Sequence, residues 1–147
     1  MGPTAQLWRR LVEDAQHALP DCREVRGYPV HRAADGKKFL EDVPELRLPA
    51  CLIVCGLNRR EVLGQQLKRT IRWSGIIIVQ DETGRGAEQA TDLADLFEAE
   101  VLDRDIVLQD GRSIWVQGSG ETAPIVASPD LAIYEIGFTT SEAIDRG

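Results

Sequence analysis

The sequence predicts an α+β fold, a single domain in which two principal helices pack on a mainly antiparallel sheet. Three observations predict it. From Leu67 to Trp73 apolar and polar residues largely alternate, as they do in a half-buried strand. From Ala87 to Val101 apolar residues recur instead at helical spacing. A length of 147 residues fits one domain, and the chain lacks the repeating strand–helix–strand order of a parallel sheet.

The first predicted element is an amphipathic helix over residues 5–19. Thr4 is a suitable N-cap, Pro20 stops the helix, and an apolar stripe lies between them. A short strand is predicted to follow at Cys22–Arg26.

Residues 27–49 show no strong periodicity and contain several turn residues. We therefore assign them to a long loop with a short possible helix at Lys38–Asp42, and we expect residues 27–48 to be mobile in the free subunit. The apolar run Ala50–Cys55 then predicts a strand.

The longest predicted strand runs from Leu67 to Val79. Its first half alternates, whereas Ile76–Val79 is a continuous β-branched run, which is typical of a strand covered on both faces. Gly75 between the halves suggests a bulge or a close approach of another chain segment. The sequence thus predicts one long antiparallel strand, open on one side early and covered on both sides late.

After the second helix, 87–101, the pattern returns to strands. Asp110-Gly111 separates the apolar stretches Ile106–Leu108 and Ser113–Gln117, which predicts a hairpin. The remaining predicted elements are a loop at Gly118–Glu121, a short strand at Pro124–Val126, a last strand at Leu131–Phe138 and a polar, frayed tail at residues 140–147.

The chain is acidic, with a formal net charge of −7, which argues against general affinity for nucleic acid. Its charges are segregated. Arg59–Arg72 holds five basic residues and one acidic residue, a local charge of +4, whereas Asp81–Asp110 holds ten acidic residues and two basic ones, a charge of −8. Acidic helix faces are usually only solvated, but complementary patches can also join identical subunits.

No apolar run approaches the length of a membrane-spanning helix, and no signal peptide is visible. We therefore expect a cytoplasmic protein that makes no membrane contact.

The Gly84–Gly86 corner follows a strand and precedes a helix, which is the context of a dinucleotide-binding fingerprint. The third glycine of that fingerprint is missing, because Gln89 stands in its place, and no phosphate-binding loop of the Gly-Lys-Ser or Gly-Lys-Thr type occurs. We expect a turn with positive φ at one or both glycines, no cofactor and no enzymatic activity.

The three cysteines predict neither a disulfide between neighbours nor a metal site. Cys51 and Cys55 lie on one predicted strand with their Cα atoms about 13 Å apart, too far for a disulfide. His17 and His31 are remote from them in sequence, so no clustered zinc-ligand set is visible, and we expect surface histidines and reduced thiols.

Three side chains are open to two interpretations. Trp73 and Trp115 could pack in the core or anchor an interface. Arg69 falls on the apolar face of its strand. It could snorkel to the rim of the core, or it could pair with an acidic residue of a neighbouring subunit.

The order of elements resembles that of a known family. A first helix ends in Ala18-Leu19-Pro20, Pro49-Ala50 opens an apolar strand, a second strand carries Lys68–Trp73 and continues into Ile76–Val79, and an acidic helix follows. A hairpin and a closing strand, Ala132–Ile136, complete the pattern. This order is similar to that of the tail terminator or minor tail proteins of long-tailed, Mu-like bacteriophages and prophages. Residues 27–48 are longer than that pattern.

The resemblance implies a structural protein of the phage tail, formed in the host cytoplasm and carried in the virion. Subunits of this family form a hexameric ring that caps the tail tube and joins it to the head. The implied partners are other copies of the chain, tail-tube proteins and head-completion proteins. DNA only passes through the ring, and neither catalysis nor a cofactor is involved.

Residues at the hypothetical subunit interface follow from the charge pattern. They are Arg59, Arg60, Lys68, Arg69, Arg72 and Trp73 of one subunit, facing Asp92, Asp95 and Glu98 of the next. Two other functions stay open at this stage: a nucleotide-binding enzyme that uses the Gly84–Gly86 corner, and a small cytoplasmic adaptor.

Overall fold

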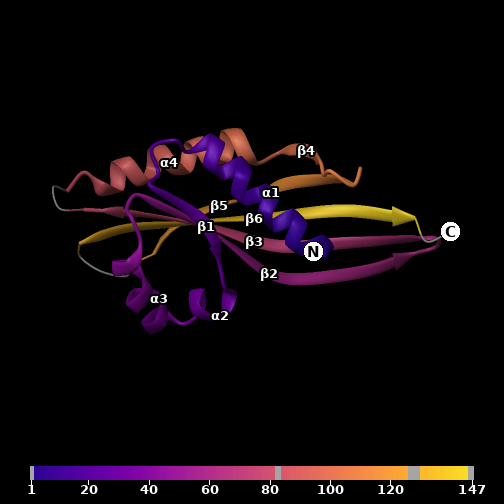
Figure 1. Cartoon of the computed structure of the whole chain (residues 1–147), viewed down its shortest axis with the longest axis horizontal. Helices are drawn as coiled ribbons and strands as arrows, with labels where there is room; N and C mark the ends of the chain where they lie inside the picture. The colour runs from indigo at the N-terminus through magenta and orange to yellow at the C-terminus, as the bar shows by residue number, and fades with distance from the viewer. Residues whose placement is uncertain (1, 82–83, 126–129, 146–147) are drawn as a thin grey trace.

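The computed structural model describes residues 2–81, 84–125 and 130–145, and it confirms a single α+β domain. Figure 1 shows a long, curled sheet with helices gathered at one end. The described helices are α1 (Pro3–Ala18), α2 (Val30–Ala33), α3 (Gly36–Asp42) and α4 (Gly86–Val101), with a 3₁₀ turn η1 (Val43–Glu45). The strands are β1 (Glu24–Tyr28), β2 (Ala50–Leu63), β3 (Gln66–Gln80), β4 (Arg104–Val107), β5 (Ser113–Ile125) and β6 (Leu131–Asp145).

The sheet is mostly antiparallel, as predicted, with the order β1-β2-β3-β6-β5-β4. The exception is β1, which runs parallel to β2. Parallel neighbours cannot be joined by a tight turn and need a crossover of a dozen or more residues. This requirement explains the length of residues 29–49, which connect the two strands.

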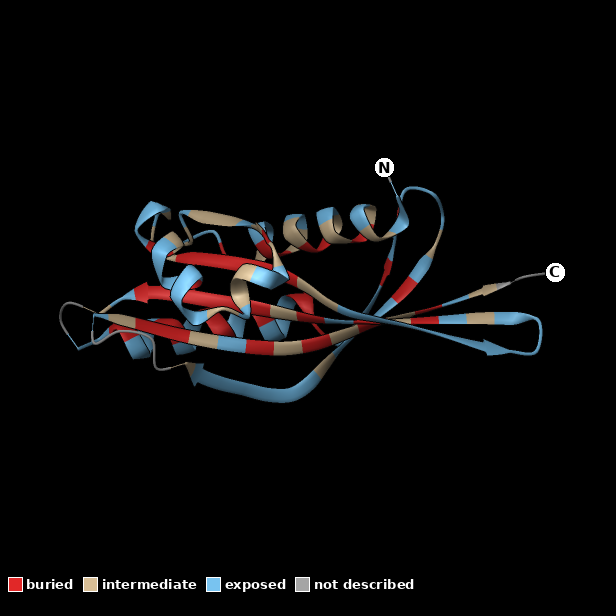
Figure 2. Ribbon diagram, turned by 90° about the horizontal axis from the view of Figure 1, so that it is seen from below, coloured by how far each residue is buried: buried red, intermediate tan, exposed pale blue. Residues whose placement is uncertain are grey.

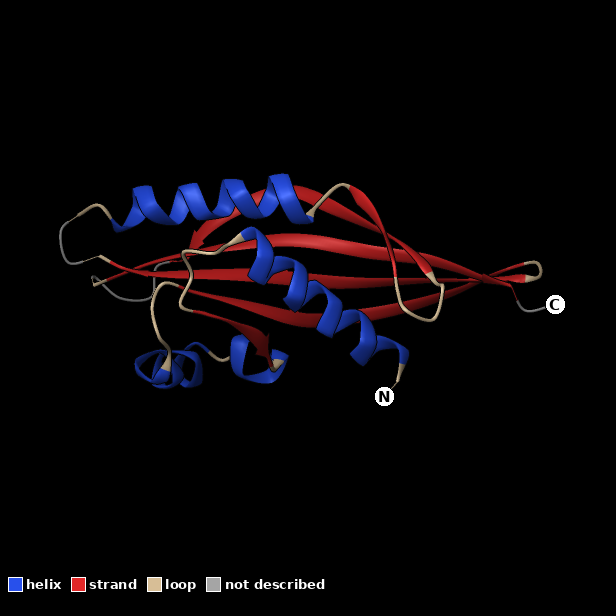
Figure 3. Ribbon diagram, turned by 45° about the horizontal axis from the view of Figure 1, so that its top comes forward, coloured by secondary structure: helices blue, strands red, loops and turns tan. Residues whose placement is uncertain are grey.

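Helices α1 and α4 cover one face of the sheet (Figure 3). Leu7 and Leu11 of α1, with Leu93 and Phe97 of α4, are buried there against side chains of β2, β3 and β6. The two principal helices predicted from the sequence are therefore confirmed, within two residues at each end.

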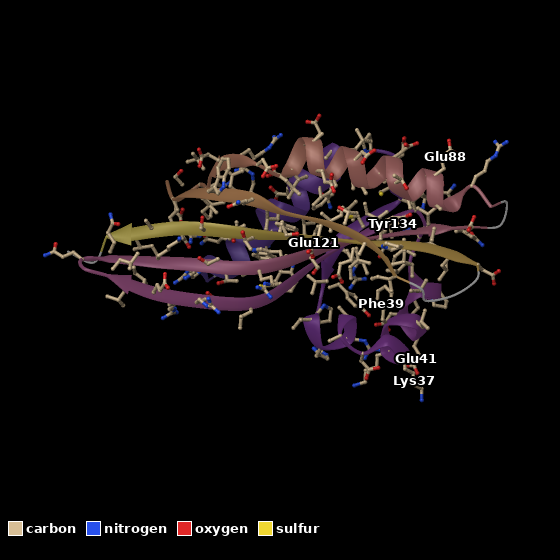
Figure 4. The ribbon with its side chains drawn as sticks, turned by 180° about the vertical axis from the view of Figure 1, so that it is seen from behind. Lys37, Phe39, Glu41, Glu88, Glu121 and Tyr134 are labelled. Atoms are coloured by element: carbon tan, nitrogen blue, oxygen red, sulfur yellow. The ribbon has the colours of Figure 1, made fainter. Side chains whose placement is uncertain are left out.

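The long loop assigned to residues 27–49 is wrong for most of its length, because α2, α3 and η1 occupy residues 30–45. Phe39 of α3 is 6% exposed and packs on the opposite face of the sheet from α1 and α4. Figure 4 shows Phe39 directed toward the sheet, with Lys37 and Glu41 pointing away from it. The predicted short helix at Lys38–Asp42 corresponds to α3.

A polar contact fastens this segment to the sheet edge. Asp42 accepts hydrogen bonds from the Tyr28 hydroxyl (2.5 Å) and from Arg32 (2.6 and 2.9 Å). The bonds from Arg32 and Tyr28 lower the pKa of Asp42, and burial together with the Asp42 contact raises the pKa of Tyr28 to about 12. The three groups thus hold α2, α3 and β1 together.

The run Ile76–Val79 is covered on both faces, as its composition predicts. Ile77 and Val79 lie in the core beneath α1 and α4, whereas Ile76 and Ile78 lie in the core beneath α3. Gly75 permits the close approach of a helix, because an added Cβ atom there would lie 3.0 Å from the ring of Phe97.

Two predicted loop segments belong instead to long strands. Gly118–Glu121 continues β5 through a register shift between Gly118 and Thr122, so the predicted loop is an irregularity within the strand. The tail predicted as frayed is paired with β3 as far as Asp145. Val126 of the predicted short strand and residues 146–147 of the predicted tail lie outside the described residues.

The strands are much longer than the helices that cover them. At about 3.3 Å per residue, the 15 residues of β3 extend about 50 Å, whereas the 16 residues of α4 extend about 24 Å at 1.5 Å each. Figure 2 shows the result, in which buried positions concentrate at the helical end and exposed positions at the end that projects beyond it. Among the described helices, none is both long and apolar enough to traverse a bilayer.

Replacing Phe39 with Ala tests the packing of α3. Because the ring is buried between α3 and the sheet, Phe39→Ala is expected to lower the free energy of unfolding by about 3–5 kcal/mol. The adjacent Leu40→Ala variant is the control, since Leu40 is exposed and should change stability by less than about 1 kcal/mol. Urea denaturation measures both, and equal small losses would support the mobile loop instead.

Candidate assembly surface

The projecting end of the sheet, which we call the arm, consists of the β2–β3 hairpin from Gly56 to Arg72 and its partner segment of β6, Thr139–Ile144. Side chains alternate between the two faces of such strands. One face of the arm continues the side that carries α1 and α4, and the other lies beyond the reach of α3. The two faces have different chemistry.

The first face holds a buried ion pair. Arg69 and Glu142 are register partners on β3 and β6, and Arg69 Nη1 lies 3.5 Å from Glu142 Oε1. Both side chains are at most one-tenth exposed, and Arg69 Nε has no hydrogen-bond partner among the described residues. The prediction that Arg69 contacts a neighbouring subunit or snorkels is therefore corrected: its acidic partner belongs to the same chain.

Arg112 completes this cluster from the β4–β5 turn. Its Nη1 atom donates to both carboxylate oxygens of Glu142, at 3.1 and 3.2 Å, and its Nε donates to Asp110 at 2.9 Å. Its Nη2 donates to the Pro3 carbonyl oxygen at the start of α1, at 3.0 Å. Glu142 is thus held by two arginines, and the arm is joined to α1 and to the turn.

Trp73 is a core residue rather than an interface residue, which corrects its place in the predicted interface. The side chain is 1% exposed, stacks on Phe138 and meets the ring of Trp8 edge-on. Its Nε1 donates to Thr140 Oγ1 at 2.9 Å, so the polar atom is satisfied inside the protein.

The second face of the arm continues across β5 and β4, so that exposed and half-buried side chains from five strands line it. Arg59 pairs in register with Thr70, Thr70 with Ser141, Ser141 with Trp115, and Trp115 with Asp105, so these side chains form one row across the sheet. We call this surface the open face. Its members are Arg59, Glu61, Lys68, Thr70, Arg72, Asp105, Val107, Trp115, Gln117, Thr139 and Ser141.

The predicted basic stretch is therefore divided between the two faces. Arg59, Lys68 and Arg72 point from the open face and are exposed. Arg60 is also exposed, but it is the register partner of Arg69 and lies on the opposite side. A single flat partner could contact the first three together and would miss Arg60.

The predicted acidic partners lie on the exposed surface of α4. Asp92, Asp95 and Glu98 are exposed, and Figure 4 shows Glu88 pointing away from the sheet. Glu98 also accepts a hydrogen bond from the Thr122 hydroxyl. Because α4 lies on the face opposite to the open face, the acidic and basic groups of one chain cannot meet each other.

Sequence reasoning missed Leu96 and the Glu142–Arg112 contact. Leu96 is a 42% exposed apolar side chain among the acidic residues of α4. Trp115 is 38% exposed, so of the two tryptophans considered as interface residues it is the one that can still contact a partner. The signal for Glu142 was available, because the alternation of β6 continues past Phe138 and places Glu142 opposite Arg69.

In the Gly84–Gly86 corner, a side chain of the same protein already uses a backbone N–H group. Gly84 has a φ of +77°, as predicted for a turn, and the Gly86 N–H donates to Asp81 Oδ1 at 2.8 Å. An added Cβ atom at Gly86 would lie 2.7 Å from Asp81. The carboxylate thus takes a donor at the start of α4 that a phosphate would need. Thr83 lies outside the described residues.

The cysteines and histidines form no metal-ligand group within the described residues. Cys51 is buried, Cys22 and Cys55 are half-buried, and all three are free thiols. Burial raises the pKa of Cys22 to about 11, with Asp21 adding to the effect. Within the described ranges, no three His, Cys, Asp or Glu residues gather closely enough to hold a metal ion.

Comparison with known proteins finds no family model that matches the chain and no matching protein among the curated ones.

Replacing Glu142 with Gln tests the buried ion pair. The change leaves Arg69 buried without a countercharge, so Glu142→Gln is expected to lower the free energy of unfolding by about 3–5 kcal/mol. Glu135→Gln is the matched control, since Glu135 is exposed on the same strand and should change stability by less than about 0.5 kcal/mol. Chemical denaturation gives both values. A loss below 1 kcal/mol for Glu142→Gln would mean that the pair is not a structural contact.

A titration with nucleotides tests the corner. Because Asp81 occupies the Gly86 N–H, calorimetry with NAD, FAD and ATP is expected to give no binding heat. A dissociation constant below about 10 μM for any of the three, roughly −7 kcal/mol, would restore the enzyme hypothesis.

Proposed function

We propose that the protein is a structural, self-assembling component of a phage or prophage tail, of the tail terminator type. In this role its subunits form a ring, hexameric in the family that the chain resembles, which closes the tail tube and presents a surface for head joining. Tail-tube and head-completion proteins are its partners. The setting is the host cytoplasm during assembly and the virion tail afterwards.

The single observation that carries the proposal is the excess length of the sheet over its helices. A monomer with an exposed sheet end keeps five strands of side chains available for a partner, whereas a self-contained enzyme needs an enclosed pocket instead. The arm also exposes apolar side chains, because Leu57 at its base and Val62 and Leu63 near its tip are each more than half exposed.

The charge of the chain suits a ring through which DNA passes. A net charge of −7 gives little general attraction for the phosphate backbone, so DNA would not be held in transit. Glu61, the register partner of Lys68, stands beside the basic side chains of the open face and limits their field.

The two alternatives have less support. A nucleotide-binding enzyme needs a free phosphate cradle, and Asp81 fills the one that the sequence suggested. A small adaptor is compatible with an exposed surface, but it gives no reason for the resemblance in the order of elements.

Deleting the coding gene from the genome that carries it tests the proposed function. A tube that is not capped has no signal to stop growing, so the lysate is expected to contain tubes of irregular length and heads without tails. Electron microscopy of the induced lysate provides the measurement, and the gene supplied in trans should restore joined particles. Normal tails in the deletion strain would refute the proposal.

A further inference from the structure

The open face is a sheet surface with an unusual combination of groups. Trp115 and Val107 expose apolar area on β5 and β4, while Arg59, Lys68 and Arg72 expose positive charge on β2 and β3. Thr70, Thr139 and Ser141 lie between these two zones and add only small side chains. The surface is therefore flat in the middle and basic on one side, and its other side combines apolar area with the carboxylate of Asp105, the register partner of Trp115.

We propose that the open face is the docking site for helix α4 of a second copy of this chain. The inference rests on the proposed function in one respect, that the partner is another copy, and it adds which surfaces meet.

Charge complementarity selects α4 as the partner. The helix carries Glu88, Asp92, Asp95, Glu98 and Glu100 and has no basic residue. Since each copy has a net charge of −7, two copies repel each other in most orientations. The orientation that sets α4 on Arg59, Lys68 and Arg72 is one in which the local charges attract.

An apolar contact lies within the same pairing. Leu96 of α4 is 42% exposed and follows Asp92 by four residues, so the two side chains are neighbours on the helix surface. Trp115 lies in the same row of the open face as Arg59, three strands away from it. With Trp115 packed on Leu96, Asp92 would lie one helical turn nearer the basic zone and Glu88 two turns nearer, and an aromatic anchor of this kind supplies most of the affinity of an interface.

The geometry makes the contact heterologous. The open face and α4 lie on opposite faces of the sheet, so one copy can use both surfaces at once with two different neighbours. Repetition of such a contact gives a closed ring if the rotation closes, or an open filament if it does not.

The free strand edges are less suitable for this contact. β1 pairs with Ala50–Val54 of β2, and the later edge of β2 bears a register shift and the charges of Arg59 to Glu61. The outer edge of β5 contains another register shift and Pro124. Bulges, proline and charges are the devices that keep strand edges from pairing, so docking through the face is favoured over docking through an edge.

Two complementary variants test the inference. The first, Arg59→Glu/Lys68→Glu/Arg72→Glu, reverses the open face and keeps α4. The second, Asp92→Lys/Asp95→Lys, reverses α4 and keeps the open face. Arg60→Glu is the matched control, because Arg60 is exposed on the same hairpin but on the opposite side. Circular dichroism checks that each variant is folded.

Sedimentation velocity is expected to show that the native chain and Arg60→Glu associate at low salt. Association should weaken at 1 M salt, where the Debye length falls to about 3 Å. Each multiple variant alone should be monomeric. Their equimolar mixture should associate again, in dimers or larger assemblies, because the native surfaces of the two variants attract each other and the two reversed surfaces, glutamates on one and lysines on the other, attract each other as well. Trp115→Ala should weaken the association of the native chain roughly tenfold or more.

Three results would overturn the inference: a native chain that stays monomeric at millimolar concentration, an Arg60→Glu variant as defective as the triple variant, or a mixture that forms no dimer. The tail function is judged separately by the deletion phenotype. Dimers in the mixture together with normal tails in the deletion strain would leave the docking contact standing and remove the tail function. Irregular tails in the deletion strain, with no dimers in the mixture, would support the tail function and refute the docking contact.

Discussion

The structure depends on a mismatch between the length of its strands and the length of its helices. Two faces of the sheet are buried at the helical end, where α1 and α4 lie on one side and α3 on the other. In the arm, the face on the side of α1 and α4 remains partly covered, and the opposite face is open. The apolar run Ile76–Val79 fits the first region, and the alternating stretch before it fits the second, so one strand carries the chemistry of both environments.

The boundary between the two regions is where a polar cluster replaces the apolar core. Arg69 and Glu142 occupy positions that the alternation assigns to the covered face, and Arg112 joins them to the start of α1. A buried ion pair contributes less to stability than an apolar pair of similar volume, but it penalises any shift of register, because a shift leaves a buried charge alone. The cluster therefore specifies how β3 and β6 align along the arm, which sets the rows of the open face.

Much of the fold was predictable because periodicity reports which faces are covered. The two principal helices, the long strand and its doubly covered end all follow from local pattern. The sequence did not reveal which segment covers the second face of the sheet, although Ile76–Val79 requires such a cover and residues 27–49 were the available stretch. Short helices such as α2 and α3 have too few turns to show a helical period. About half of the candidate surface was predictable from the sequence. Charge patterning identified Arg59, Lys68, Arg72 and the acidic residues of α4. Only the strand register shows that Arg60 lies on the opposite face from Arg59, that Trp73 is buried and that Trp115 is exposed.

The central claim is that the open face is exposed in the free chain and covered in the assembled one. Hydroxyl-radical footprinting measures this directly, because tryptophan oxidation follows solvent access. The account predicts that Trp115 is oxidised in the dilute chain and protected after assembly, together with Leu96, while buried Trp73 stays protected in both states. Equal oxidation of Trp115 before and after assembly would contradict the account.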